Sequence, residues 1–381
     1  MKSAPALIEP EVLRWARESA GYSIDEASSK IAVRAEKLAA VEHGELQLTL
    51  RQAERAARVY RRSLAMLFLP EPPAEEPVET QFRRLPGSPQ PPWPSEMRLL
   101  ARTVTERQEA AVTIYEELDE QPPWIDFSLP FSDVADTLAD EARTALGITL
   151  DQQRSWRDPT GYRPLTAWRE AVELVGVLVM QDGSLPVEQL RGFAAVHPLV
   201  PAIVLNSKDD ARARAFTLVH ELGHLLRARA DHANADADEA WCDQFAGVLL
   251  MPAEPFSSDF SALRRSEPTL LNAVDALSRS YGVTPAAGLV RISRLHLLAQ
   301  PELDRVRGDI ERRSASAPRS TGGGDYYRNT LARLGPAFTR LVLAGLDEAA
   351  VTSAGAAGLL GTRIDHFPKL IERLADPVEA A

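Results

Sequence analysis

Apolar residues recur every three or four positions through the first 70 residues, which is the spacing of amphipathic helices. This spacing predicts four short helices and a final apolar run, which begin near Glu11, Ser23, Arg34, Thr49 and Leu64. Ser23 is followed three residues later by Glu26, a capping-box pair that marks the start of the second helix. We therefore expect a compact helical domain over residues 1–70.

Proline, glycine and serine mark two breaks in the chain. Prolines crowd residues 70–77 and 86–94, which should be extended, so a linker is expected over residues 71–95. Serine and glycine dominate residues 314–324, where a second, flexible linker is expected. The two other predicted parts are a central domain over residues 96–313 and a C-terminal helical module over residues 325–381.

Helical and strand-like patterns are mixed in the central domain. Helical spacing covers residues 95–120, 132–146, 163–174 and 285–298, and short apolar strands are expected at residues 175–180 and 203–205. This mixture predicts an α+β fold with a small sheet. In the C-terminal module, Gly335 and Pro336 should interrupt a helix over residues 326–343, because proline lacks an amide donor.

The strongest chemical signal is His220-Glu221 followed by His224, inside an apolar stretch over residues 216–226. Positions four apart lie on one face of a helix, so both imidazoles can bind one metal ion. Zinc held by two imidazoles and a carboxylate keeps a fourth position for water and lowers the pKa of that water towards neutrality. Glu221 can then accept its proton, which is the chemistry of metal-assisted peptide hydrolysis.

The alternative is a chance pattern on a surface helix, and two features count against it. Leu218, Val219 and Leu222 make the helix largely buried, and buried histidines need partners. Gly223 lies between the two candidate ligands, where a side chain would crowd the metal or a nearby element. We therefore predict a metal site.

A third ligand is available on a second amphipathic helix, whose apolar positions run from Trp241 to Leu249 before Pro252. Glu239 and Asp243 are four apart on one face of it. Glu239 can bind the metal, while Asp243 orients a ligating histidine from behind. The alternative is a solvated acidic helix start, because acidic residues suit a helix N-terminus.

The two motifs together resemble the ImmA/IrrE (M78) family of metallopeptidases, over roughly residues 165–300. The resemblance implies a zincin-like core in which zinc is bound by His220, His224 and Glu239 and the general base is Glu221. Asp243 stands where many members of the family have Asn. Trp241 and Cys242 fill positions that are often Glu and Ala, so the packing of that helix is expected to differ locally.

Composition limits the class of protein and the cellular compartment that we expect. Apolar residues make up 45% and charged residues 25% of the chain, as in ordinary globular proteins. A net charge of -11 argues against a protein that coats nucleic acid, though not against one small DNA-reading module. The single cysteine excludes internal disulfides and fits a reducing compartment. No apolar run is long enough for a signal peptide or a membrane span, so we expect a cytoplasmic protein without membrane contact.

The N-terminal helices resemble an Xre/Cro-type helix-turn-helix module, in which Ser23 starts the second helix and Gly44 follows the recognition helix. The resemblance implies DNA binding, with Arg34 and Lys37 as the basic residues of that helix. Residues 1–70 hold eleven Lys and Arg against nine Asp and Glu, so phosphate contacts would be few. Two interpretations stay open: DNA binding, and a protein-docking or dimerising role.

Two functions are compatible with these patterns. The first is a zinc-dependent endopeptidase, and the family resemblance implies a specific regulatory target, a repressor or antitoxin, in stress response, phage immunity or toxin–antitoxin control. A toxin partner and a homodimer are compatible with that setting. The second is a DNA-binding transcriptional regulator or antitoxin whose metal site is structural or little used. A structural zinc is normally closed by four protein ligands, so three ligands beside Glu221 favour the enzyme.

Overall fold

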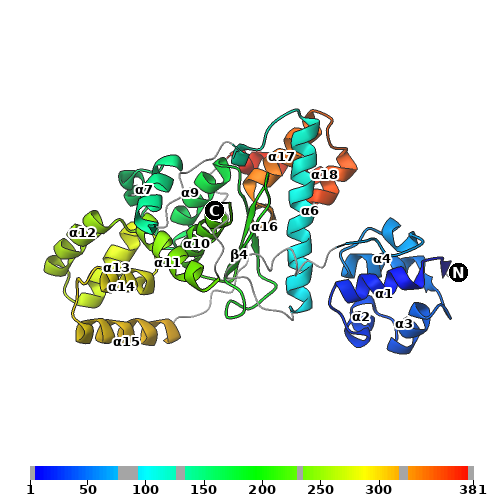
Figure 1. Cartoon of the computed structure of the whole chain (residues 1–381), viewed down its shortest axis with the longest axis horizontal. Helices are drawn as coiled ribbons and strands as arrows, with labels where there is room; N and C mark the ends of the chain where they lie inside the picture. The colour runs from blue at the N-terminus through cyan, green and yellow to red at the C-terminus, as the bar shows by residue number, and fades with distance from the viewer. Residues whose placement is uncertain (1–4, 76–92, 126–133, 230–234, 317–324, 376–381) are drawn as a thin grey trace. The chain divides into compact units, whose positions relative to one another are not determined.

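The computed structural model describes residues 5–75, 93–125, 134–229, 235–316 and 325–375 (Figure 1). These residues are mostly helical with two small sheets, which agrees with the predicted α+β class. The chain divides into two compact units, Met1–Arg84 with Pro89–Glu106 and Leu85–Ser88 with Arg107–Ala381. The division falls inside one long helix, α6 (Ser95–Glu117), which contributes its first half to one unit and its second half to the other.

The first unit consists of short helices and a two-stranded antiparallel sheet. Its elements are β1 (Pro5–Ala6), α1 (Pro10–Ser19), α2 (Ile24–Ile31), α3 (Ala35–Glu42), β2 (Leu48–Thr49), α4 (Leu50–Val59) and η1 (Ala65–Phe68). The capping box predicted at Ser23 is present, because the Glu26 amide donates to Ser23 Oγ at 3.2 Å and the Ser23 amide donates back to the Glu26 carboxylate. Thr49 forms a second capping box with Gln52.

A buried ion pair ties α1 to α3 in this unit. Arg17 Nε and Nη2 each donate to the Glu42 carboxylate at 2.8 Å, and both residues are buried. Two parallel hydrogen bonds of this kind fix orientation as well as charge. Arg102, from the first half of α6, donates to the carbonyls of Ser19 and Tyr60, where α1 and α4 end. These bonds satisfy carbonyls that a helix end leaves without a partner.

A three-stranded sheet lies at the centre of the second unit. Its strands are β3 (Leu178–Asp182), β4 (Gly192–Ala195) and β5 (Ala202–Asn206), in the order β3-β5-β4. β3 runs parallel to β5, and β4 runs antiparallel to it with Ala194 opposite Ile203. The first strand begins later than the predicted residue 175, because Gly176 turns the chain with a φ of +92° after the preceding helix.

Helices cover both faces of this sheet (Figure 1). α9 (Tyr162–Leu174) and α10 (Ala211–Arg229) pack on one face, and α16 (Tyr326–Leu334), α17 (Pro336–Asp347) and the second half of α6 lie on the other. Gln108 of α6 donates to the carbonyls of Ala195 at 3.1 Å and Val200 at 2.9 Å, which holds that helix on the β4 side.

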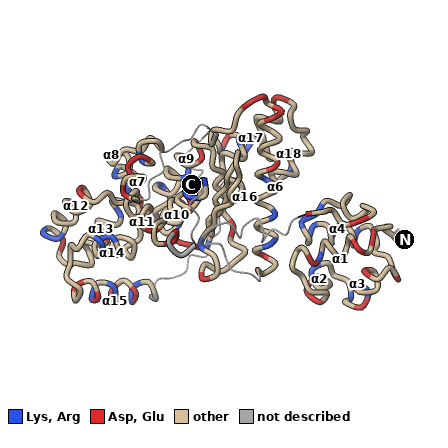
Figure 2. The backbone as a smooth tube through the Cα atoms, viewed as in Figure 1, with Lys and Arg blue, Asp and Glu red and all other residues tan. Residues whose placement is uncertain are grey.

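The remaining helices extend the second unit around α10 and beyond α17. They are η2 (Pro123–Ile125), α7 (Ala135–Ala145), α8 (Leu150–Ser155), α11 (Ala235–Leu250), α12 (Ala253–Ser266), α13 (Leu270–Tyr281), α14 (Pro285–Arg294), α15 (Gln300–Ser316), α18 (Ser353–Leu360), η3 (Ile364–His366) and α19 (Phe367–Ala375). The sequence pattern did not predict α8, α12, α13 or α15. Basic and acidic positions alternate along α15 (Figure 2), and only a narrow apolar stripe marks its buried side. No helix among the described residues combines the length and hydropathy needed to cross a bilayer.

The C-terminal module packs onto the sheet through a sharp break between two helices. As predicted, α16 ends at Gly335 and Pro336 opens α17, where its missing amide costs nothing. Gly335 has a φ of +85°, and a Cβ there would lie 2.5 Å from the Val179 carbonyl of β3. Only glycine fits this conformation and this contact, so the backbone of the module touches the strand directly.

Replacing Gly335 with Ala should therefore destabilise the second unit. The left-handed φ and the contact with the Val179 carbonyl should together lower the free energy of unfolding by about 2–4 kcal/mol. Gly358→Ala is the matched control, because Gly358 lies inside α18 and an added Cβ would meet no atom within 4 Å, so Ala should raise helix stability by about 0.5–1 kcal/mol. Urea denaturation measures both changes, and equal effects of the two variants would contradict the close contact.

Candidate metal centre

Helix α10 carries His220, Glu221 and His224 into the interior of the second unit. Asp210 precedes this helix, and its carboxylate accepts a hydrogen bond from the Arg212 amide at 2.8 Å, which fixes the helix start. The leucines and valine around the motif are buried, and His224 is only 2% exposed. The predicted buried character of the helix is therefore present, and the two histidines point to the side on which α11 packs.

Gly223 sets the distance between α10 and α11. A Cβ at this position would lie 3.2 Å from Cys242 Sγ and 3.2 Å from Phe245 Cδ1, both on α11. These contacts are tighter than ordinary van der Waals packing, so a side chain at residue 223 would require Cys242 or Phe245 to shift by a few tenths of an ångström. The sequence predicted that a side chain at residue 223 would crowd the metal or a nearby element. In the structure, the crowded element is the neighbouring helix α11.

This packing brings the three predicted ligands together. Glu239 Oε2 lies 3.3 Å from His220 Nε2, and Glu239 Oε1 lies 3.3 Å from His224 Nε2. The two Nε2 atoms are 3.1 Å apart. All three ligand groups have an atom within 4.8 Å of the others, and one ion could contact them all.

The chemistry of these atoms fits a divalent cation. A neutral imidazole offers a lone pair at Nε2 when Nδ1 carries the proton, and a carboxylate offers only lone pairs. Four such atoms facing one another repel unless a proton or a cation lies among them. Two imidazoles and one carboxylate are the ligand set of catalytic zinc sites, so His220, His224 and Glu239 are suited to hold zinc.

Both imidazoles are backed by a second side chain from α11. His220 Nδ1 lies 3.1 Å from Asp243 Oδ1, as predicted for a residue that orients a ligand. His224 Nδ1 lies 3.4 Å from Cys242 Sγ, a contact that the sequence did not predict. Cys242 is fully buried, and burial raises the pKa of its thiol, so it stays protonated and faces away from the side where the ligands meet.

Charge coupling among these groups is strong. Burial acts to lower the pKa of His220, but its contacts with Asp243 and Glu239 outweigh burial and raise that pKa to about 10. Contacts with His220 and His224 hold the pKa of Glu239 well below its usual range. The carboxylates of Asp243 and Glu239 therefore stabilise positive charge at the imidazoles.

Glu221 lies beside the ligands without belonging to them. It is 8% exposed, and burial raises the pKa of its carboxyl group. Interactions with His220 and His224 offset part of the effect of burial, and the Ala194 amide of strand β4 does so to a smaller extent. The edge strand β4 thus lies beside the predicted base.

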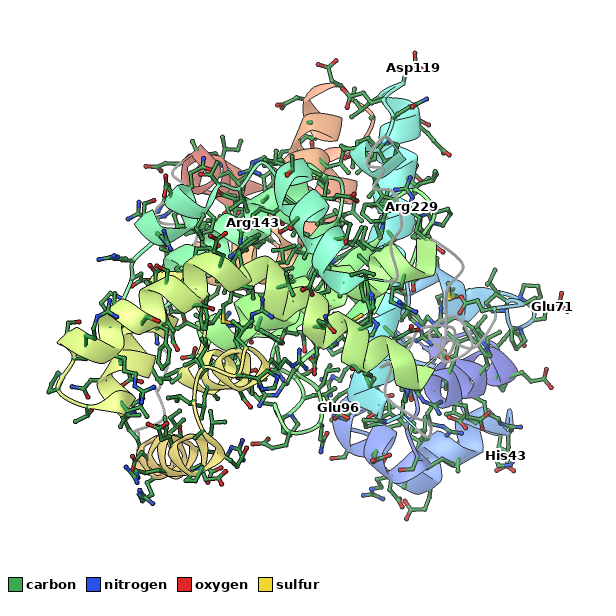
Figure 3. All side chains as sticks on the ribbon, turned by 60° about the vertical axis from the view of Figure 1, so that its left-hand side comes forward. His43, Glu71, Glu96, Asp119, Arg143 and Arg229 are labelled. Carbon is green, nitrogen blue, oxygen red and sulfur yellow. The ribbon has the colours of Figure 1, made fainter. Side chains whose placement is uncertain are left out.

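The far end of α11 is held by side chains from three other helices. Arg143 of α7 donates to the Leu249 carbonyl, and Figure 3 shows this residue among the helices of the second unit. Gln153 of α8 donates to the Leu250 carbonyl at 2.9 Å, and Arg291 of α14 donates to the Met251 carbonyl at 2.9 Å. These bonds cap the helix that supplies Glu239, so they fix its position along its own axis.

A cleft of about 470 Å³ opens above the ligands. Its size is within the range of ligand-binding pockets. It is lined by residues before and within β4, on α10 and α11, and along α14, including Arg191, Phe216, Met251, Val290, Arg291 and Arg294. The sequence pattern missed the wall formed by α14. The sequence did contain a signal for this wall. Arg291 and Arg294 lie three residues apart on a predicted helix with few other charges.

Arg34 and Lys37, the residues predicted to contact DNA, belong to the first unit and not to this centre. Arg34 is exposed and precedes α3. Lys37 Nζ donates to Gln52 Oε1 at 2.9 Å, so its charge is held at the start of α4. Residues 32–34 join α2 to α3 as a short turn.

Comparison with known families agrees with the motif at this centre. A family model for the IrrE N-terminal-like domain, peptidase M78, matches residues 173–293. The match runs from the end of α9 to the end of α14, so it contains the sheet, the ligand helices and the α14 wall. Comparisons with curated proteins and with solved structures gave no match. The matched part of this chain is therefore similar to a peptidase-like domain of the ImmA/IrrE type.

Proposed function

We propose that this protein is a zinc-dependent endopeptidase. The observation that carries the proposal is the convergence of His220, His224 and Glu239 within 4.8 Å at a cleft, with the Glu221 carboxylate beside them. The match of residues 173–293 to a peptidase family supports it. A closed structural zinc site would need a fourth protein ligand, and Cys242 Sγ lies at the opposite nitrogen of His224.

In the proposed peptide hydrolysis, three residues bind the metal and a fourth, Glu221, transfers the proton. Zinc bound by the three ligands would supply a Lewis acid for the scissile carbonyl. The Glu221 carboxylate accepts a proton from water as the oxygen of that water bonds to the carbonyl carbon. Glu221 then gives the proton to the amine that leaves when the C–N bond breaks.

The proposed target is a specific regulatory protein, a repressor or antitoxin, in stress response, phage immunity or toxin–antitoxin control. The similarity of the catalytic part to the ImmA/IrrE type supports this target class. We propose that the small helical first unit selects this target, either directly or through DNA.

A DNA-binding regulator with a little-used metal site is the alternative. The short turn between α2 and α3 and the exposed Arg34 favour it, while the hydrogen bond from Lys37 to Gln52 would compete with a phosphate contact. Figure 2 shows both acidic and basic positions along the helices of the first unit. Loss of target cleavage in a folded Glu221 variant distinguishes the enzyme from the regulator.

Zinc content is the first test. The purified protein should contain about one zinc per chain, and His224→Ala should lose it, because one of the three ligands is removed. His296→Ala is the control, since His296 is exposed just beyond the end of α14 and lies outside the ligand group. Elemental analysis after dialysis gives the ratio. Full zinc content in His224→Ala would show that the ligands are assigned wrongly.

Glu221→Gln tests the base. This change keeps the size of the side chain and removes its ability to accept a proton, so cleavage of the true target should fall by about 10³-fold while zinc is retained. The target is identified as the protein that co-purifies with the Glu221→Gln variant, and cleavage is then followed by gel electrophoresis. Near-normal cleavage by a folded, zinc-loaded variant would exclude the mechanism.

Asp243→Ala should have a milder effect. Loss of the carboxylate behind His220 should weaken zinc binding by about 10–100-fold and leave the fold intact. Gln244→Ala is the matched control, because the neighbouring Gln244 donates to Asp136 and does not touch a ligand. Competition with a zinc chelator measures both affinities, and equal values would mean that Asp243 does not position His220.

A further inference from the structure

The α14 wall of the cleft carries two arginines that the proposed chemistry does not use. Arg291 is 5% exposed, and its Nε donates to the Met251 carbonyl. Its Nη2 is buried and makes no hydrogen bond among the described residues. Arg294 lies one turn further along α14, and its Nη1 is 3.9 Å from the position of a Cβ on Gly247.

A buried guanidinium nitrogen without a hydrogen-bond partner lowers the stability of the fold, because its desolvation is not compensated. This points to a missing acceptor. Burial lowers the pKa of Arg291, the Asp136 carboxylate opposes this, and the charge of Arg294 adds to it. The two guanidinium groups therefore increase the local positive charge instead of cancelling it. The third arginine of the cleft differs, because Arg191 lies 3.3 Å from the Asp209 carboxylate.

Among the described residues that line the cleft, no acidic side chain lies outside the ligand end. Phe216, Ala287 and Val290 present apolar side chains, and the acidic side chains of the cleft are gathered at the ligand end. A peptide lying along the cleft would meet a metal-binding end and an arginine pair. Guanidinium groups bind carboxylates in a planar, two-bond geometry, which neutral peptide groups cannot match.

We propose that Arg291 and Arg294 bind a carboxylate of the peptide that occupies this cleft and so determine which peptides are selected. This inference rests on the proposed peptidase function. The carboxylate can come from an Asp or Glu side chain or from the C-terminus of the peptide, and these sources require different probes.

The test measures binding to zinc-loaded Glu221→Gln protein, which does not depend on turnover. The probes are two random hexapeptide libraries, one with amidated C-termini and one with free C-termini, and bound peptides are sequenced by mass spectrometry. Enrichment of Asp or Glu at one position of the amidated library would identify a side-chain carboxylate. Enrichment only in the free library, without a side-chain preference, would identify the C-terminal carboxylate.

Variants of Arg294 in the same background assign the selection to the arginine pair. Arg294 makes no hydrogen bond or ion pair among the described residues, so Arg294→Gln should leave the fold unchanged and reduce the enrichment about tenfold. Arg294→Glu should replace the acidic preference with Lys and Arg. Arg305→Gln is the control, because Arg305 is exposed on α15 and does not line the cleft. Thermal melting checks that each variant is folded.

Two results would overturn the inference: no selection for a carboxylate in either library, or full selection retained in folded Arg294→Gln combined with Arg291→Lys. A different result would contradict the peptidase proposal but not this inference. In that case the libraries still show the carboxylate preference, but zinc-loaded wild-type protein cleaves none of the selected peptides. Cleavage with a specificity that the arginine variants do not change would leave the peptidase proposal standing and remove this one.

Discussion

The close packing of α10 against α11 at Gly223 is the constraint on which the whole metal centre depends. One helix places His220 and His224 on the same face without help, because their spacing is local. Glu239 belongs to another helix, and its carboxylate reaches both imidazoles only when the two helix axes come close. The absence of a side chain at residue 223 permits that distance. The bonds that cap the far end of α11 then prevent it from sliding, so groups remote from the ligands set the ligand geometry.

The part of the centre that depends on short-range periodicity could be predicted from the sequence. The spacing of His220 and His224 and the four-residue step from Glu239 to Asp243 follow from helix geometry alone, and the structure gathers all four side chains. The break at Gly335 was equally local, since proline cannot continue a helix. In each case the signal and its consequence lie within two turns of the same segment.

Features that depend on long-range packing could not be predicted in this way. The strand β4 is four residues long, and its role beside Glu221 follows from the order of the strands, which no local pattern contains. The α14 wall faces the cleft only because α12 and α13 turn the chain back, and neither helix was predicted. The contact of Cys242 with His224 could not be predicted either. It depends on the distance between α10 and α11, which depends on how Gly223 packs.

The single cysteine has a practical consequence for studying this protein. Cys242 is shielded from solvent in the packed state, and its protonated thiol is a poor nucleophile, so a thiol-reactive dye should not modify it while α10 and α11 remain in contact. Modification then requires a transient separation of the two helices, and the labelling rate reports how often that separation occurs. The native chain thus contains its own probe for local opening of the centre, and no engineered label is needed to follow how a bound ion changes its dynamics.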